Sequence, residues 1–224
     1  MLRRLILTAL IAGSLAGVTA AAVQQMKAIP LILEAEVYER AAMAADEPAS
    51  AAWEPAPGVE RIAYRVLTDG LAGFGFGLIL AGAFALYEVS GGVAGGKIDG
   101  RRGVVWGLAG FAVFSLAPGL GLPPELPGMT AAALGLRQSW WIGTAAATAA
   151  GLGFLVFGTR LPWRAAGIGL ILLPHLIGAP HMPAESGNLP AELGASFVMA
   201  SLVSAAAFWL VLGGVGGWVY RRLS

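Results

Sequence analysis

The sequence contains no cysteine and only two histidines among its 224 residues. Without cysteine, the chain can form no disulfide, no iron–sulfur cluster and no metal site built on thiolates. Charged residues are also scarce, at 12% of the chain, and the formal net charge of +1 gives no reason to expect a nucleic-acid partner. Any metal ligands must therefore be imidazole, oxygen or thioether groups.

Apolar residues dominate what remains. They make up 57% of the chain, and the mean hydropathy is +0.74, which is more apolar than the surface of a soluble domain tolerates. The 33 glycines suit helices that pack closely in lipid, where small residues let backbones approach. The apolar runs are long and continuous rather than alternating, which disfavours a transmembrane barrel. The composition therefore predicts a helical membrane protein.

Six apolar stretches are each near the ~20 residues that cross a bilayer as a helix. The sequence thus predicts an all-α, polytopic transmembrane helical bundle that forms one integral membrane domain over residues 1–224. The fifth stretch is the shortest. The first stretch has an alternative interpretation as a cleaved signal peptide, which would leave five spans. The six lie at about residues 5–23, 66–87, 103–122, 140–158, 163–177 and 197–220.

Basic residues alternate between the ends of these stretches, and they favour the cytoplasmic side of short loops. This pattern predicts a membrane protein with both termini in the cytoplasm. Residues 24–65 then form an acidic extracytoplasmic loop, with a short helix before an alanine- and proline-rich part at 41–58. The basic residues on the predicted cytoplasmic side are Arg3, Arg4, Lys97, Arg101, Arg102, Arg160, Arg164, Arg221 and Arg222.

Glycine pairs four residues apart recur in the spans, and we interpret them as sites of close helix packing. Tryptophans near the span ends, including Trp140, have an ordinary explanation as rings in the headgroup zone. The glycine pairs are Gly13 with Gly17, Gly73 with Gly77, Gly103 with Gly107, and Gly213 with Gly217.

Both histidines lie in one short stretch after the fifth span. His175 follows Pro174 and His181 follows Pro180, and Met182 adds a thioether. Because proline removes backbone donors, we expect this stretch to be unwound or kinked, with freed carbonyls that help to coordinate a cation. The competing interpretation is a re-entrant turn in which each imidazole only satisfies a carbonyl.

Carboxylates on the same predicted side supply oxygen ligands. Glu34, Glu36 and Glu39 follow Pro30 closely, and Asp69 stands at the predicted start of the second span. Imidazole with carboxylate suits cobalt, nickel, zinc, iron or manganese. The alternatives are a solvated acidic loop for the glutamates and a helix cap for Asp69.

Nucleotide binding is not expected. Residues 91–97 match the spacing of a phosphate loop, but Ile98 stands where a hydroxyl should hold magnesium, and a membrane span precedes them in place of a strand. Recognised nucleophile and metalloprotease motifs are also missing from the sequence. We therefore expect no enzyme and no nucleotide partner.

The composite of several stretches resembles the CbtA family, the larger membrane subunit of a predicted bacterial cobalt transporter described with about five membrane segments. The resemblance implies import of Co²⁺ for cobalamin synthesis, together with a small, single-span, histidine-containing subunit (CbtB-like). It also implies that Gln24, Gln25, Glu34 and Glu36 belong to a functional surface. The stretches are residues 23–25, 30–39, 106–111, 116–118, 122–128, 137–141 and 174–180.

These observations predict a metal importer that captures its ion outside and passes it inward past Asp69. The predicted outer ligands are His175, His181, Glu34 and Glu36, and Co²⁺ is not distinguished from Ni²⁺ or Zn²⁺ by this ligand set. Two other functions fit the sequence. One is a membrane assembly or scaffold subunit whose proline-rich loop at 122–128 binds a partner, and the other is a membrane-embedded enzyme that uses the histidines and carboxylates as acid and base.

Overall fold

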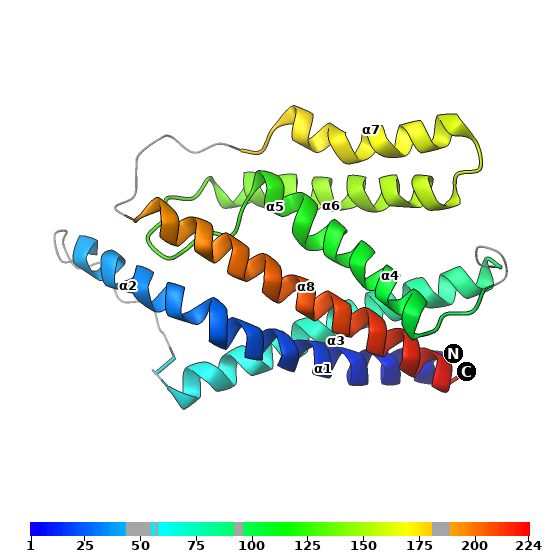
Figure 1. Ribbon diagram of the computed structural model, residues 1–224, viewed down its shortest axis with the longest axis horizontal. Coiled ribbons are helices and arrows are strands. Elements are labelled where there is room, and N and C mark those ends of the chain that lie inside the picture. The colour runs from blue at the N-terminus through cyan, green and yellow to red at the C-terminus, as the bar shows by residue number, and fades with distance from the viewer. Residues whose placement is uncertain (44–54, 57, 92–95, 181–188) are drawn as a thin grey trace. The chain divides into compact units, whose positions relative to one another are not determined.

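A computed structural model describes residues 1–43, 55–56, 58–91, 96–180 and 189–224. Within these residues every regular element is a helix, which confirms the predicted all-α class (Figure 1). The elements are α1 (Leu2–Lys27), α2 (Ile29–Met43), α3 (Val59–Val89), α4 (Gly100–Phe111), a π-helix η2 (Ala112–Leu116), α5 (Ala117–Gly121), α6 (Leu134–Phe157), α7 (Leu161–Ile177) and α8 (Ala191–Arg222).

Five helical segments are long and apolar enough to cross a membrane: α1, α3, the continuous run Gly100–Gly121, α6 and α8. The sixth predicted span is α7, which is apolar but has only 17 residues. Several helices extend beyond the predicted spans because their first turns are less apolar than their centres. The largest difference is at α3, which begins at Val59 rather than near residue 66.

The chain divides into two compact units. Unit 1 comprises Met1–Ile29, Glu47–Gly110 and Val203–Ser224, and it contains α1, α3, most of α4 and the C-terminal part of α8. Unit 2 comprises Pro30–Asp46 and Phe111–Leu202, and it contains α2, η2, α5, α6, α7 and the start of α8.

Glycines set the closest helix contacts in unit 1. A methyl group added to Gly13 of α1 would collide with the Gly73 carbonyl of α3, and one added to Gly103 of α4 would collide with the Gly213 carbonyl of α8. Gly77 meets the backbone of Ala9 in the same way. The predicted glycine pairs therefore do pack helices together, α1 against α3 and α4 against α8.

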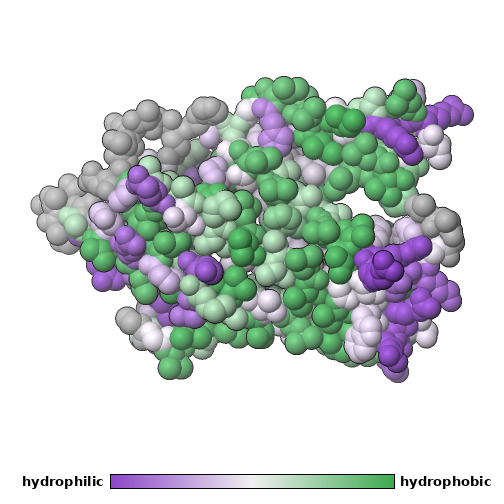
Figure 2. Space-filling model, in the orientation of Figure 1, coloured by the Kyte–Doolittle hydropathy of each residue, from purple (hydrophilic) through white to green (hydrophobic). Residues whose placement is uncertain are grey.

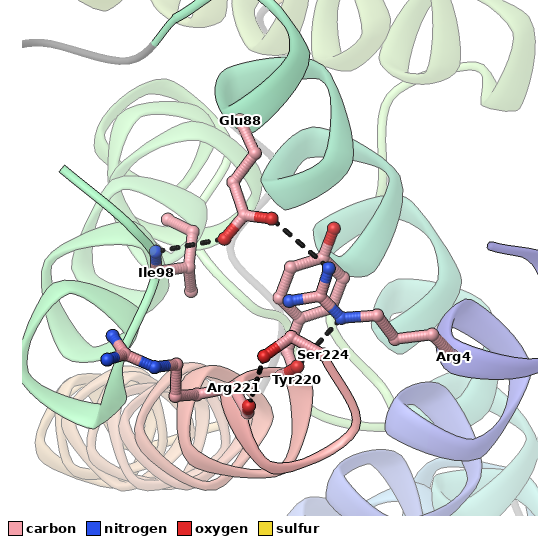
Figure 3. A network of polar contacts seen from close by, with 6 residues as sticks. All are labelled: Arg4, Glu88, Ile98, Tyr220, Arg221 and Ser224. Atoms are coloured by element: carbon pink, nitrogen blue, oxygen red, sulfur yellow. Dashed lines mark hydrogen bonds and ion pairs between the residues drawn. The ribbon is translucent and has the colours of Figure 1, made fainter. Parts of the chain in front are cut away.

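The N-terminus of α1 and the C-termini of α3 and α8 meet at one end of unit 1 (Figure 3). The Arg4 guanidinium lies 3.1 Å from the Glu88 carboxylate, and its Nε donates to the Tyr220 carbonyl at 2.8 Å. The backbone N–H of Ile98 donates to the other Glu88 oxygen at 3.2 Å. The sequence predicts the same three ends to lie on one side of the membrane, and the structure brings them together.

Unit 2 is built around α6, which runs beside α7 (Figure 1). A third glycine contact, between Gly151 of α6 and Gly167 of α7, holds this pair together. On another side α6 contacts η2 and α5. The π-helix precedes Pro118, which has no N–H for a regular helical bond, and here the Ala117 N–H bonds to the Ala112 carbonyl five residues earlier.

Hydrophobic side chains cover much of the exposed surface along the helices, and hydrophilic ones gather near their ends (Figure 2). Leu10, Leu71, Ile142 and Leu172 are all exposed. In water such a surface would be costly, but in hydrocarbon it is the expected exterior. This distribution agrees with a membrane-embedded helical protein.

Candidate functional site

Asp69 lies inside α3, ten residues after the helix begins at Val59. The alternative that it caps the helix start is therefore wrong. The backbone carbonyl of Asp69 packs against Gly17 of α1, where the two helices cross. The helix pair thus holds the Asp69 carboxyl group beside the C-terminal part of α1.

Two glutamines at the end of α1 meet Asp69 and its helical neighbour Arg65. Gln24 is within hydrogen-bonding reach of the Asp69 carboxylate. Arg65, four residues before Asp69 on the same helix, donates to the Gln25 side-chain oxygen at 3.2 Å. The structure therefore brings together three of the predicted residues, Gln24, Gln25 and Asp69, and adds Arg65 to them.

One oxygen of Asp69 is still available. Its Oδ2 atom is buried and has no hydrogen-bond partner among the described residues. A buried carboxylate oxygen without a partner loses its hydration and gains nothing in exchange, so it favours a bound cation or a proton. We call Gln24, Gln25, Arg65 and Asp69 the Asp69 cluster.

Three predicted glutamates lie on α2, which belongs to unit 2. On a regular helix, residues two apart point roughly 200° apart, so Glu34 and Glu36 face different sides of α2. Glu36 and Glu39 lie on neighbouring positions of one side, as expected from their spacing. Glu34 is exposed, whereas Glu36 is half-buried and forms an ion pair with Arg40 at 3.1 Å.

His175 lies on α7, in unit 2, and the helix continues past it to Ile177. The chain is therefore not unwound at Pro174 itself, and its non-helical part begins at Gly178. A proline this near the end of a helix removes one hydrogen bond, and the helix stops where Gly178 takes a φ of +89°. The half-buried imidazole packs edge-on against Trp140, with ring centroids 6.0 Å apart.

The remaining predicted ligands, His181 and Met182, lie outside the described residues. In the part of the chain that the structure describes, no group of three or more histidine, aspartate and glutamate side chains is arranged to hold a metal ion. The predicted outer site of His175, His181, Glu34 and Glu36 stays a prediction.

The sequence interpretation missed Arg65 and the contacts of Trp140. Arg65 precedes Asp69 by four residues, and that spacing on a helix is a signal that could have found it. Trp140, which the sequence predicts to lie in the headgroup zone, packs against Gly121 and His175, about two turns inside a helix that begins at Leu134. Its position in the headgroup zone stays a prediction.

Residues 2–221 match the family model of the probable cobalt transporter subunit CbtA. The chain belongs to the CbtA family. The match covers both units and all of the helices, except for the last residue of α8. The resemblance seen in separate stretches therefore extends over nearly the whole chain. No curated protein and no solved structure matches this sequence.

Proposed function

We propose that this CbtA-family chain is the metal-carrying membrane subunit of an importer of divalent transition metal ions, with Co²⁺ as the cargo. Metal is captured on the outer side by His175, His181 and one of the two glutamates Glu34 and Glu36, and it is passed inward past Asp69. The chain lies in the bacterial inner membrane with both termini in the cytoplasm, and it works with a small, single-span, histidine-containing partner. A gradient or that partner supplies the energy, because the sequence carries no nucleotide motif.

The observation that carries the inward step is the buried Oδ2 atom of Asp69, which has no partner among the described residues. Such an oxygen can serve as a metal ligand, since a bound divalent cation compensates the cost of its burial. The Gln24 amide lies beside it and offers a second oxygen donor after rotation. Oxygen donors bind cobalt less tightly than imidazole does, which suits a site that must also release the ion.

Arg65 stabilises the negative charge of the Asp69 carboxylate. Its positive charge lies close enough to Asp69 to act on the carboxylate electrostatically, while its own N–H groups bind Gln25. A cation that arrives at Asp69 must overcome this charge. We expect this repulsion to limit how long the ion stays at Asp69.

On the outer side, the geometry of α2 separates the two predicted glutamates. Because Glu34 and Glu36 face different sides of the helix, we expect only one of them to bind a given ion together with His175. Glu36 is the better candidate, since it is half-buried and shares its side with Glu39. Its Arg40 partner is largely exposed, so the pair is weak and metal can displace it.

The deciding experiment measures accumulation of cobalt, nickel and zinc by cells that express the chain together with its small partner subunit. Asp69→Asn keeps the shape of the side chain and removes its charge, so we expect cobalt uptake to fall at least about tenfold. Glu60→Gln is the matched control, because Glu60 is an exposed carboxylate on the same helix. Uptake should be unchanged in this control.

Two results would overturn the proposal. One is full uptake by the Asp69→Asn variant, and the other is full uptake when His175 and His181 are both replaced by alanine. A purified chain that binds no divalent metal would instead favour the scaffold function, in which the chain only assembles a transporter made of other subunits.

A further inference from the structure

Three polar atoms along one side of α6 are buried and have no hydrogen-bond partner within the described residues. They are Nε1 of Trp140, Oγ1 of Thr144 and Oγ1 of Thr148. The two threonines are only 1% and 3% exposed. At four-residue intervals on a helix, the three side chains fall within an arc of roughly 80°, with neighbouring Cβ atoms about 5–6 Å apart. We call these residues the α6 polar stripe.

Several other helical hydroxyls in this chain are satisfied locally, although Thr8 of α1 is also buried without a partner among the described residues. Thr19 and Thr68 each donate to the carbonyl four residues earlier at 2.8 Å, and Ser139 does so at 2.7 Å. This local bond is the usual way in which a hydroxyl is satisfied inside a helix. Thr144 and Thr148 do not make it, although they are the more deeply buried and need it more. Their hydroxyls therefore lack the local bond that usually satisfies this side chain inside a helix.

Neighbouring elements enclose the stripe at both ends. At one end Trp140 packs between Gly121, where α5 stops, and His175 on α7. At the other end, one turn past Thr148, α6 meets α7 at the Gly151–Gly167 contact, where backbones touch and leave no room for a side chain. The stripe thus starts beside a half-buried imidazole and ends at a tight helix crossing, all within unit 2.

Leaving such atoms unsatisfied would be expensive. Each buried hydroxyl or N–H without a partner costs about 1–3 kcal/mol, and lipid supplies no substitute for water. Water can remove this cost between the two threonines, because their Cβ atoms are about 5–6 Å apart and each Oγ1 is bonded directly to its Cβ, so that one water molecule with two hydrogen bonds of about 2.8 Å spans the pair. A further water is needed to satisfy the Trp140 N–H.

We propose that the α6 polar stripe lines a narrow, hydrated recess that admits water and small cations into unit 2 from the His175 end. It extends roughly 12 Å, the rise over eight helical residues, and it stops at the Gly151–Gly167 crossing. The threonine oxygens can accept hydrogen bonds or coordinate a cation, while the indole N–H orients the first water. If the metal route proposed above is correct, the recess lets an ion at His175 keep part of its hydration shell.

Because the chain has no cysteine, single cysteines can report on this recess without background. Thr144→Cys and Thr148→Cys are placed in membrane vesicles and exposed to Ag⁺ in chloride-free buffer, and free thiols are then alkylated with a fluorescent maleimide after denaturation. Ag⁺ reaches a buried thiol only along water. Two controls lie in the same helix: Ala149→Cys on the opposite, exposed side, and Ala145→Cys, which is buried but lies outside the polar stripe.

We expect Ag⁺ to abolish maleimide labelling at positions 144 and 148 and to leave positions 145 and 149 fully labelled. Position 144 should react faster, because it is nearer to the open end. Labelling at 144 and 148 that matches the controls would overturn the recess, and so would protection at all four positions. Protection at 144 alone would also contradict it, since the recess must reach Thr148.

A second measurement separates this inference from the transport function. Thr144→Val and Thr148→Val remove the hydroxyls but keep the shape, and Thr→Ser at the same positions keeps the hydroxyls. In a Thr144→Val, Thr148→Cys chain we expect Ag⁺ protection at position 148 to be lost, and in the matching Thr144→Ser chain to be retained. Failure of the Asp69 and histidine tests with intact Ag⁺ protection would remove the metal route and leave the recess standing.

Discussion

The carbonyl oxygen of Asp69 lies directly against Gly17, where an added methyl carbon would come within 2.6 Å of it. This contact fixes the height at which α3 presents the Asp69 carboxylate to Gln24. The same two helices also touch at Gly13 and Gly73, one turn further along. The position of the Asp69 cluster therefore depends on a run of backbone contacts that only glycine permits.

Replacing Gly17 with alanine should consequently destabilise the protein. We expect the free energy of unfolding to fall by about 1–3 kcal/mol, because the new methyl group has no space between the two backbones. The measurement is thermal or denaturant unfolding of the purified chain in detergent. Gly75→Ala is the matched control, since nothing lies within 4 Å of an added methyl there. It should be neutral or stabilise by up to about 1 kcal/mol, and an equal loss in both variants would contradict the close contact.

The contact between Gln24 and Asp69 predicts non-additive effects on uptake. Gln24→Leu removes the amide beside the carboxylate, and Asp69→Asn removes the charge that the amide supports. If both residues act on one ion, the double variant should lose little more cobalt uptake than Asp69→Asn alone. Initial rates of uptake in the four members of this cycle test the prediction. Strictly additive losses would mean that the two side chains act separately.

Much of the fold could be predicted because its signals are local. Continuous apolar runs identify helices, and glycine pairs identify the faces that approach a neighbour. The pairs do not say which helices meet, and the Gly151–Gly167 contact has no matching signal because each helix contributes one glycine. The start of α3 was placed too late for a related reason, since Arg61 and Arg65 lower the hydropathy of its first turns although they do not interrupt the helix.

The candidate site was only partly predictable. Asp69, Gln24 and Gln25 were named, but Arg65 was not, because a basic residue near a span end has an ordinary explanation in the loop charge. Pro174 indicated a break that the structure does not show, since the loss of one hydrogen bond near a C-terminus is tolerated. Thr144 and Thr148 carry no sequence signal at all, because their significance comes from burial without a partner.

The Arg4–Glu88 pair predicts a loss of stability when either charge is removed. Both side chains are only about a fifth exposed, at 18% and 22%, so each leaves the other poorly hydrated when it is lost. We expect Arg4→Gln and Glu88→Gln each to lower the free energy of unfolding by about 1–2 kcal/mol. The double variant should lose less than the sum of the two. Glu60→Gln, on the exposed start of the same helix as Glu88, should change nothing, and the same unfolding measurement checks all four.

The geometry of α2 predicts unequal roles for its glutamates. Glu34 and Glu36 face different sides of the helix, and only Glu36 shares its side with Glu39. Glu36→Gln should therefore raise the KM for cobalt uptake about fivefold or more, a loss of roughly 1 kcal/mol of binding, while Glu34→Gln should leave it within about twofold.

Arg40→Gln is the control that removes the Glu36 ion pair but keeps the carboxylate. Because Arg40 no longer competes with the metal ion for the Glu36 carboxylate, the KM in that variant should fall or stay the same. A rise in KM for Arg40→Gln equal to that of Glu36→Gln would show that the ion pair, and not the carboxylate as a ligand, is what uptake requires.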